Sequence, residues 1–195
     1  MSAIGDFSFN LFMFPFEKIV LHKFRRDTVS TASGDVLELG AGTGVNFKYY
    51  NKNELNSISI LDLKISDSVR NVSKGFSNIK LFEGSAENLP FPDSSFDTVV
   101  FTLVFCSVDN PERGLSEVHR VLRDNGKIIF IEHVEPESKR VKAVAEKVNS
   151  AWNSFSNGCN INRQTLQSII SSGFSLKPDS YKRKGVFITG TAMKI

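Results

Sequence analysis

The sequence predicts an α/β fold: a doubly wound, mostly parallel seven-stranded sheet with a C-terminal antiparallel hairpin and helices on both faces. Three observations support this prediction. Short apolar segments alternate with helical patterns between residues 34 and 133, which is typical of parallel sheets. The first of these segments runs directly into a glycine-rich turn. Near the C-terminus, two further strands are joined by a tight turn at 182–185, which indicates a hairpin.

The elements of the first two thirds follow in order. Apolar residues from Phe16 to Phe24 recur at helical spacing, so a helix is expected there. Strands are expected at 36–39, 57–62, 79–82, 98–104 and 127–132, with helices at 47–50, at 67–74 and from 111 to a stop at Gly126. The segment 98–104 is apolar on both faces, which favours a central parallel strand.

The last third predicts two helices and the hairpin. Residues 137–155 carry an apolar stripe with lysines on the outer face, and Asn162 is expected to cap a helix that ends at Gly173. The hairpin strands are expected at 174–181 and 186–195. We expect a single domain with three parts: an N-terminal helical lid segment (1–33), a cofactor-binding core (34–135) and an acceptor-side part (136–195).

The N-terminal segment is unusually aromatic, because five phenylalanines and a methionine lie within residues 7–16. Pro15 suits the start of a helix there. One interpretation is a helix packed on the domain. The others are a lid over an apolar substrate, or a basic amphipathic segment that makes peripheral contact with a membrane.

Composition excludes several classes of protein. A net charge of +3 is too small to indicate a nucleic-acid partner, and no metal site is expected. The two cysteines, Cys106 and Cys159, form no disulfide framework, so free thiols in a reducing, cytoplasmic compartment are expected. The sequence contains neither an apolar run of about 18 residues nor a signal-peptide pattern, so no spanning helix is expected.

Chemistry-bearing residues follow the predicted strands. Gly40, Gly42 and Gly44 come directly after the first strand. Asp62 ends the second strand at the distance where a carboxylate reaches ribose hydroxyls in this architecture. The spacing is G-x-G-x-G rather than the dinucleotide pattern G-x-G-x-x-G, and Glu38 before the first glycine would repel a pyrophosphate. These features favour a nucleoside-bearing, cationic cofactor.

Residues 36–44 resemble the first motif of class I S-adenosylmethionine-dependent methyltransferases. The stretches 84–97 and 117–127 resemble G-D-A-E-x-L-P-F-x-D-x-S-F-D and E-x-x-R-V-L-(K/R)-P-G-G of the quinone-biosynthesis-like branch. Further pieces at 42–47, 102–108 and 132–134, followed by Trp152 and 158–163, are similar to alkyl-thiol methyltransferases. Phospholipid N-methyltransferases share much of this outline.

The resemblance implies S-adenosylmethionine as the cofactor. It implies that the cofactor-binding residues are Glu38, Gly40, Ala41, Gly42, Gly44, Asp62, Leu63, Ser85, Ala86, Glu87, Thr102 and Leu103. Among these, Glu38 would organise the methionine amino group, Asp62 would bind the ribose, and Ala86 would lie beside the adenine. Ser85 departs from the usual Asp, which leaves the contact with the adenine amino group open.

The expected activity is methyl transfer to a small apolar or lipid-like acceptor, a thiol or an amine. His133 and Trp152 are the candidate acceptor-side residues, and the alternatives are a structural histidine and a core tryptophan. The absence of N/D-P-P-Y/F after the fourth strand argues against a base or amide nitrogen as acceptor. The other hypotheses are a non-catalytic S-adenosylmethionine-binding regulatory or interaction module, and a nucleotide-dependent oxidoreductase. No catalytic residue, acceptor atom or oligomeric state follows from the sequence.

Overall fold

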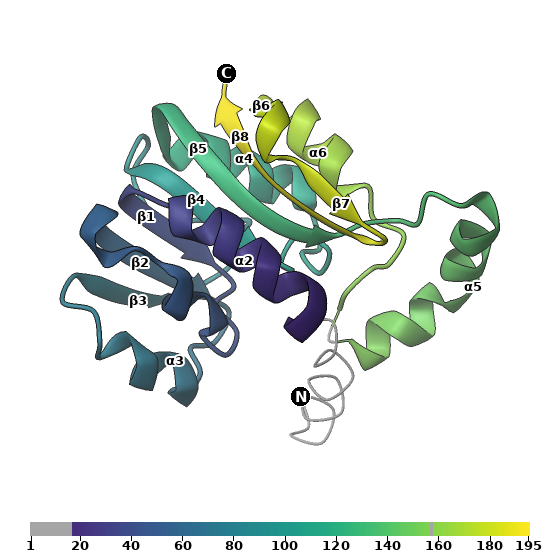
Figure 1. The fold of residues 1–195 in the computed structure, drawn as a ribbon, viewed down its shortest axis with the longest axis horizontal. Helices are drawn as coiled ribbons and strands as arrows, with labels where there is room; N and C mark the ends of the chain where they lie inside the picture. Colours follow the sequence, from purple (N-terminus) through teal and green to yellow (C-terminus); the bar gives the residue numbers. More distant parts are fainter. Residues whose placement is uncertain (1–16, 157) are drawn as a thin grey trace.

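The computed structural model describes residues 17–156 and 158–195, and the phenylalanine-rich stretch up to Phe16 lies outside them. A single eight-stranded sheet runs through the described residues in the order β3-β2-β1-β4-β5-β8-β6, and β7 also pairs with β8 (Figure 1). The strands are β1 Gly34–Leu39, β2 Leu55–Asp62, β3 Ile79–Glu83, β4 Phe96–Thr102, β5 Leu122–His133, β6 Phe174–Leu176, β7 Lys182–Lys184 and β8 Phe187–Lys194. The α-helices are α2 His22–Thr28, α3 Asp67–Ser73, α4 Pro111–Val121, α5 Lys139–Phe155 and α6 Thr165–Ser171.

The predicted doubly wound architecture is confirmed. Strands β1 to β5 pair in parallel, whereas β8 is antiparallel to β5. The chain winds outward from β1 to β2 and β3, then returns to β4 on the other side of β1. Such a reversal opens a crevice beyond the carboxyl ends of the two neighbouring strands. The site is therefore expected between β1 and β4.

Alternating side chains divide the core into two layers. On β1, Leu37 and Leu39 point into the layer covered by α4 and α6, which contribute Leu115 and Ile169 among others. Val36 points into the opposite layer, which holds α2 and α3. This period-2 alternation is what a strand buried on both faces requires, and it fixes the register of the sheet.

Two predicted boundaries are wrong, at the end of α4 and at the end of β4. Helix α4 ends at Val121 rather than at Gly126, because Leu122 takes an extended backbone and pairs with Phe96. Strand β4 ends at Thr102, because Leu103 has a positive φ of 59°.

The C-terminal part also departs from its expected bounds. The sheet has eight strands instead of seven, because the expected strand 174–181 shortens to β6 and the hairpin around Gly185 is formed by β7 and β8. A 3-10 helix, Pro178–Ser180, separates β6 from β7. Helix α6 starts after Gln164, and not at Asn162.

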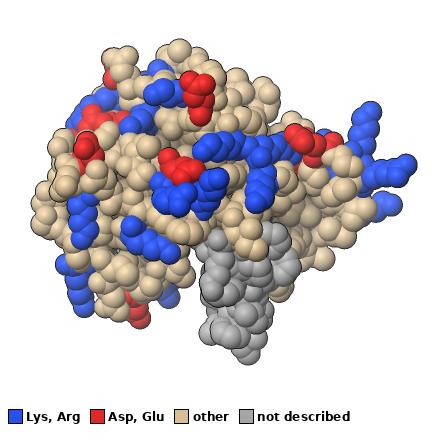
Figure 2. Space-filling model, viewed as in Figure 1, with Lys and Arg blue, Asp and Glu red and all other residues tan. Residues whose placement is uncertain are grey.

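Helix α5 stands apart from the body of the domain (Figure 1). Its apolar stripe is largely exposed: the relative exposures of Val141, Val144 and Val148 are 52%, 59% and 45%. At its start, Lys139 and Arg140 are exposed. Figure 2 shows basic side chains over this outer end of α5, whereas acidic and basic groups are mixed over the rest of the visible face. Among the described residues, no helix combines the length and apolarity needed to cross a bilayer.

Candidate functional site

A cleft opens at the carboxyl ends of the parallel strands, at the reversal between β1 and β4. It has a volume of about 440 Å³. We call it the cofactor cleft, and its lining residues are Leu39, Gly40, Gly42, Leu61, Asp62, Leu63, Gly84, Ser85, Ala86, Glu87, Leu103, Val104, Ser107, Val108, Asp109 and Gly158. The position is the one that the topology predicts for a ligand site.

The glycine-rich turn forms one wall of the cleft. Gly40 and Gly42 have φ values of +66° and +56°, a conformation that side chains rarely adopt. A Cβ on Gly40 would lie 2.5 Å from Val104 Cγ2, whereas a Cβ on Gly42 would meet nothing within 4 Å. The Gly42 N–H donates to Asp62 Oδ2 at 2.9 Å. This bond fixes the Asp62 carboxylate beside bare backbone, where a ribose can approach it.

Charge in the cleft selects among cofactors. Three of its lining residues, Asp62, Glu87 and Asp109, are acidic, and no lysine or arginine is among the described residues that line it. A pyrophosphate would meet uncompensated like charge here, whereas a sulfonium and an ammonium group would be attracted. The acidic lining and the glycine turn, which carries no side chain, therefore fit S-adenosylmethionine. The Asp62 carboxylate is available to the ribose hydroxyls.

A buried polar network lies behind the glycine turn. The two carboxylate oxygens of Glu38, which is fully buried, accept hydrogen bonds from Asn46 Nδ2 and from the Tyr50 hydroxyl, each at 2.8 Å. Burial raises the pKa of Glu38, although both hydrogen bonds oppose the shift. Arg25 on α2 donates to Asn46 Oδ1 and, at 2.9 Å, to Thr102 Oγ1. The network connects α2, β1 and β4 and supports the turn from beneath.

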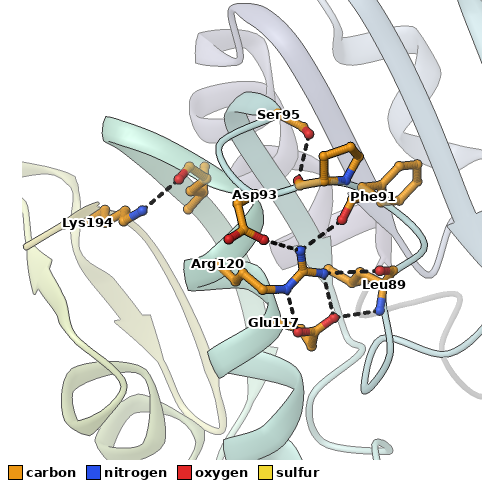
Figure 3. Close-up of polar contacts among 9 residues, drawn as sticks. Leu89, Phe91, Asp93, Ser95, Glu117, Arg120 and Lys194 are labelled. Carbon is orange, nitrogen blue, oxygen red and sulfur yellow. Dashed lines mark hydrogen bonds and ion pairs between the residues drawn. The ribbon is translucent and has the colours of Figure 1, made fainter.

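Arginine 120 on α4 anchors the loop that supplies the next wall of the cleft. Its guanidinium donates to the carbonyls of Leu89 and Phe91 at 3.1 and 2.8 Å and pairs with Asp93 at 2.7 Å (Figure 3). Glu117, one turn earlier on α4, pairs with Arg120 and accepts the Leu89 N–H at 2.8 Å. The Arg120 side chain holds the pKa of Glu117 below its usual range. The similarity of 117–127 to the family motif thus has a structural cause, which sequence analysis did not identify.

Glutamate 132 holds the turn that follows β4. Its fully buried carboxylate accepts the backbone N–H groups of Val104, Phe105 and Cys106 at 2.9, 3.0 and 3.2 Å. Burial raises the pKa of Glu132 to about 7, against the effect of these three hydrogen bonds. The turn begins at Leu103 with its positive φ and carries cleft residues Val104 and Ser107. Glu132 is therefore a positioning residue that the sequence did not reveal.

Two further cavities continue from the cofactor cleft toward α5. A small one of about 80 Å³, the neck cavity, is lined by Leu103, Cys106, Ser107, His133, Trp152, Ser156, Cys159 and Phe187. A larger one of about 300 Å³, the apolar pocket, is lined by His133, Pro136, Val141, Val144, Ala145, Val148, Trp152, Ile161, Val186 and Phe187. The neck shares Leu103 and Ser107 with the cleft, and it shares His133, Trp152 and Phe187 with the apolar pocket.

The predicted site residues divide into two groups. The structure places Gly40, Gly42, Asp62, Leu63, Ser85, Ala86, Glu87 and Leu103 on the wall of the cofactor cleft. Glu38, Ala41, Gly44 and Thr102 are not among the residues that line it, so their direct contact with a cofactor stays a prediction. His133 and Trp152 meet at the boundary of the neck and the apolar pocket. Within the described residues, His133 Nδ1 is buried and has no hydrogen-bond partner.

Sequence reasoning missed other lining residues, among them Ser107, Asp109 and Gly158. Ser107 and Asp109 lie just beyond the fourth strand, whose end was expected at Val104. Gly158 comes from the distant segment after α5, which no local pattern connects to the glycine turn. The 158–163 similarity was the one available signal for that segment.

Comparison with known proteins agrees with this site. Residues 37–130 match a family described as a methyltransferase domain. The chain is 35% identical over 152 residues to the thiol S-methyltransferase TMT1B of Mus musculus, covering 73% of this chain and 62% of the relative. It thus spans about three fifths of the length of the thiol methyltransferases that it matches.

A bacterial relative and a solved structure extend the comparison. The YcgJ protein of Bacillus subtilis superposes with a TM-score of 0.63 at 24% identity, covering 75% of this chain and 64% of that one, which shows the shared fold. The phosphatidylethanolamine N-methyltransferase of Cereibacter sphaeroides is 32% identical over 147 residues, covering 73% of this chain and 69% of the relative. With these similarities and the geometry of its cleft, the chain belongs to the class I S-adenosylmethionine-dependent methyltransferases.

Proposed function

We propose that this chain transfers the methyl group of S-adenosylmethionine to a small apolar thiol. The observation that carries the proposal is the series of three cavities, in which the neck has walls in common with both the cofactor cleft and the apolar pocket. An acceptor held in the apolar pocket can present its reactive atom through the neck toward the cleft. Similarity to the thiol S-methyltransferases supports the same conclusion.

The main task of the residues in the cofactor cleft is to position the cofactor. Bound S-adenosylmethionine supplies a methyl group that is already electrophilic, because it is attached to a sulfonium. Asp62 would bind the ribose hydroxyls, Ser85 and Ala86 would lie beside the adenine, and the bare Gly40–Gly42 backbone would allow close approach. Alignment of two reactants by itself supplies an effective molarity on the order of 10⁵ M or more.

The acceptor side favours an uncharged, apolar molecule. Apart from His133, the described residues that line the apolar pocket are hydrophobic or proline, and none is a lysine or arginine. A phosphodiester head group would enter this pocket without a cation to pair with, which is costly in an apolar site. An alkyl thiol has no such cost. The His133 imidazole, at the junction of pocket and neck, is placed to accept the thiol proton.

An amine acceptor is the second candidate, because the Cereibacter phosphatidylethanolamine N-methyltransferase is also similar over most of this chain. The division into a lid segment (1–33), a cofactor-binding core (34–135) and an acceptor-side part (136–195) belongs to the same proposal. So do a cytoplasmic location and peripheral membrane contact through the N-terminal phenylalanines, which lie outside the described residues.

The test is a methyl-transfer screen with deuteromethyl-labelled S-adenosylmethionine, read by mass spectrometry of the products. Alkyl thiols, quinone precursors and vesicles of phosphatidylethanolamine serve as acceptors. We expect label on the thiols. At a cofactor concentration below its dissociation constant, Asp62→Ala should lower the signal about 10- to 100-fold. Asp124→Ala, a matched change at a side chain 96% exposed, should leave it unchanged.

Two results would contradict the proposal. Label on phosphatidylethanolamine alone would favour the amine candidate. Tight binding of S-adenosylhomocysteine without transfer to any acceptor would favour a non-catalytic binding module.

A further inference from the structure

Both cysteines of the chain meet in the wall of the neck cavity. Cys106 comes from the turn after β4, and Cys159 comes from the segment after α5. The Asn160 backbone N–H and side-chain amide both donate to the Cys106 carbonyl, at 2.8 and 3.2 Å, and bring the two segments together. Both thiols therefore line one small cavity, which holds only about 80 Å³.

The surroundings make the two sulfurs unequal. The pKa of Cys159 falls to about 5, chiefly through hydrogen bonding from Cys106, and the His133 imidazole and the Trp152 indole contribute to this lowering while burial opposes it. The same contact with Cys159, together with burial and the nearby Glu132 carboxylate, raises the pKa of Cys106 well above its ordinary value. Cys159 is therefore the thiolate of the pair and Cys106 the thiol. The thiolate is the form that attacks peroxides and disulfides.

We propose that Cys106 and Cys159 are a redox modification site, at which a hydroperoxide converts the pair to a reversible disulfide that closes the neck. The Cys159 thiolate attacks the peroxide O–O bond, giving Cys159 sulfenic acid and releasing hydroxide or alkoxide. The Cys106 sulfur then attacks the Cys159 sulfur, forming the S–S bond. The Cys106 proton and the sulfenic hydroxyl leave as water. In sum, the thiolate and the thiol lose two electrons and one proton, and the peroxide is reduced to hydroxide or alkoxide and water.

The consequence for activity rests on the proposed function. The neck holds only about 80 Å³, and both sulfurs line it. A disulfide there ties the turn after β4 to the segment after α5 and places a covalent cross-link in the wall of the passage between the apolar pocket and the cofactor cleft. Asp62 and Ser85 lie on the cleft wall and do not line the neck, so binding of the cofactor should survive oxidation.

The chemical step is tested on the whole chain without any acceptor. After brief treatment with dilute hydrogen peroxide and alkylation of free thiols, intact-mass analysis should show loss of two hydrogens and no alkylation, reversed by dithiothreitol. Since the sequence has only these two cysteines, an intramolecular disulfide can join no other pair. Cys106→Ser should instead trap Cys159 as a sulfenic acid that dimedone labels. Cys159→Ser should leave Cys106 alkylated and unoxidised.

The functional step has a separate readout. Oxidised protein should bind S-adenosylhomocysteine as before, while methyl transfer to the acceptor falls by about 10²-fold, the typical cost of misplaced reacting groups. Trp152 is the single tryptophan and lines the neck, so its fluorescence should change on oxidation and recover with dithiothreitol.

Different results overturn different statements. Independent oxidation of both thiols, or a disulfide that forms only in urea, would refute the modification site. Unchanged methyl transfer by the bridged protein would refute the closure of the neck. If no acceptor is turned over even when the thiols are reduced, the proposed function fails, while the mass and fluorescence results still decide whether the disulfide forms.

Discussion

The two sides of the site are built in opposite ways. On the cofactor side, formed by the turns after β1 to β4, buried carboxylates hold backbone and side chains in place, as Glu132 and Glu38 do. On the proposed acceptor side (136–195), helix α5 leaves its apolar stripe exposed, and Val144 is 59% accessible. The cofactor side is thus pre-organised by these buried hydrogen bonds. The acceptor side offers apolar surface that an acceptor itself would cover.

The largest expected effect is on the stability of the cofactor side. Glu132→Ala leaves three buried backbone N–H groups without their acceptor. At about 1–3 kcal/mol for a buried unsatisfied group, with partial relaxation, the free energy of unfolding should fall by about 4 kcal/mol. Urea denaturation measures it. The matched change Glu137→Ala, at a side chain 77% exposed, should cost no more than about 0.5 kcal/mol. Equal losses would show that the carboxylate does not hold the turn.

The same carboxylate predicts a pH dependence. Its pKa is about 7 in the folded state against an ordinary 4.5, so its ionisation opposes folding. The stability that the protonated form provides is complete below pH 4.5 and is lost as pH rises toward and through about 7. The loss is about 3 kcal/mol, from about 1.4 kcal/mol per pKa unit. The pKa of Glu38 is also raised, so its ionisation lowers stability in the same way. The pKa values of Asp97 and Glu117 are lowered, so the stability that these two carboxylates provide is lost as the pH falls into the acidic range.

The difference between the wild-type protein and Glu132→Gln isolates this contribution. Glutamine keeps one accepting oxygen but no charge, so the variant should lose less stability between pH 4.5 and 7 than the wild type. Urea midpoints measured across this range supply the comparison. Parallel curves for the two proteins would show that Glu132 keeps an ordinary pKa.

This contrast also explains what the sequence could predict. The strand order and the positions of Gly40 and Asp62 follow from local patterns, because the carboxyl ends of parallel strands meet at one edge. The role of Glu132 did not follow, because its partners lie about thirty residues earlier and are backbone groups, which carry no residue-specific signal. The exposure of α5 was equally hidden, since an apolar stripe looks the same whether the core or a ligand covers it.

A smaller effect is expected from the ribose contact on the cofactor side. Asp62→Ala removes the acceptor of the Gly42 N–H and the proposed partner of the ribose. The dissociation constant of S-adenosylhomocysteine should rise about 10- to 100-fold, which corresponds to about 1–3 kcal/mol. Isothermal titration calorimetry measures it. If affinity is unchanged, Asp62 does not belong to the cofactor site. Occupancy of the apolar pocket by an acceptor should be affected little.

The smallest effect is expected on the acceptor side, where the KM for the acceptor should change and the stability should not. Val144→Ser removes apolar surface from the wall of the apolar pocket, at a position already exposed to solvent. The free energy of unfolding should change by no more than about 0.5 kcal/mol. The KM for an apolar thiol should rise about fivefold, near 1 kcal/mol, with kcat and cofactor affinity unchanged.

Val72→Ser is the matched control, because Val72 lies on α3 on the cofactor side and is 40% exposed. It should leave the acceptor KM unaltered. An equal rise in KM for both variants would mean that α5 does not form the acceptor wall. A fall in stability for Val144→Ser alone would mean that the stripe is packed in solution. Either result would contradict the distinction drawn above, between a cofactor side that is pre-organised and an acceptor side whose exposed apolar surface is covered only when the acceptor binds.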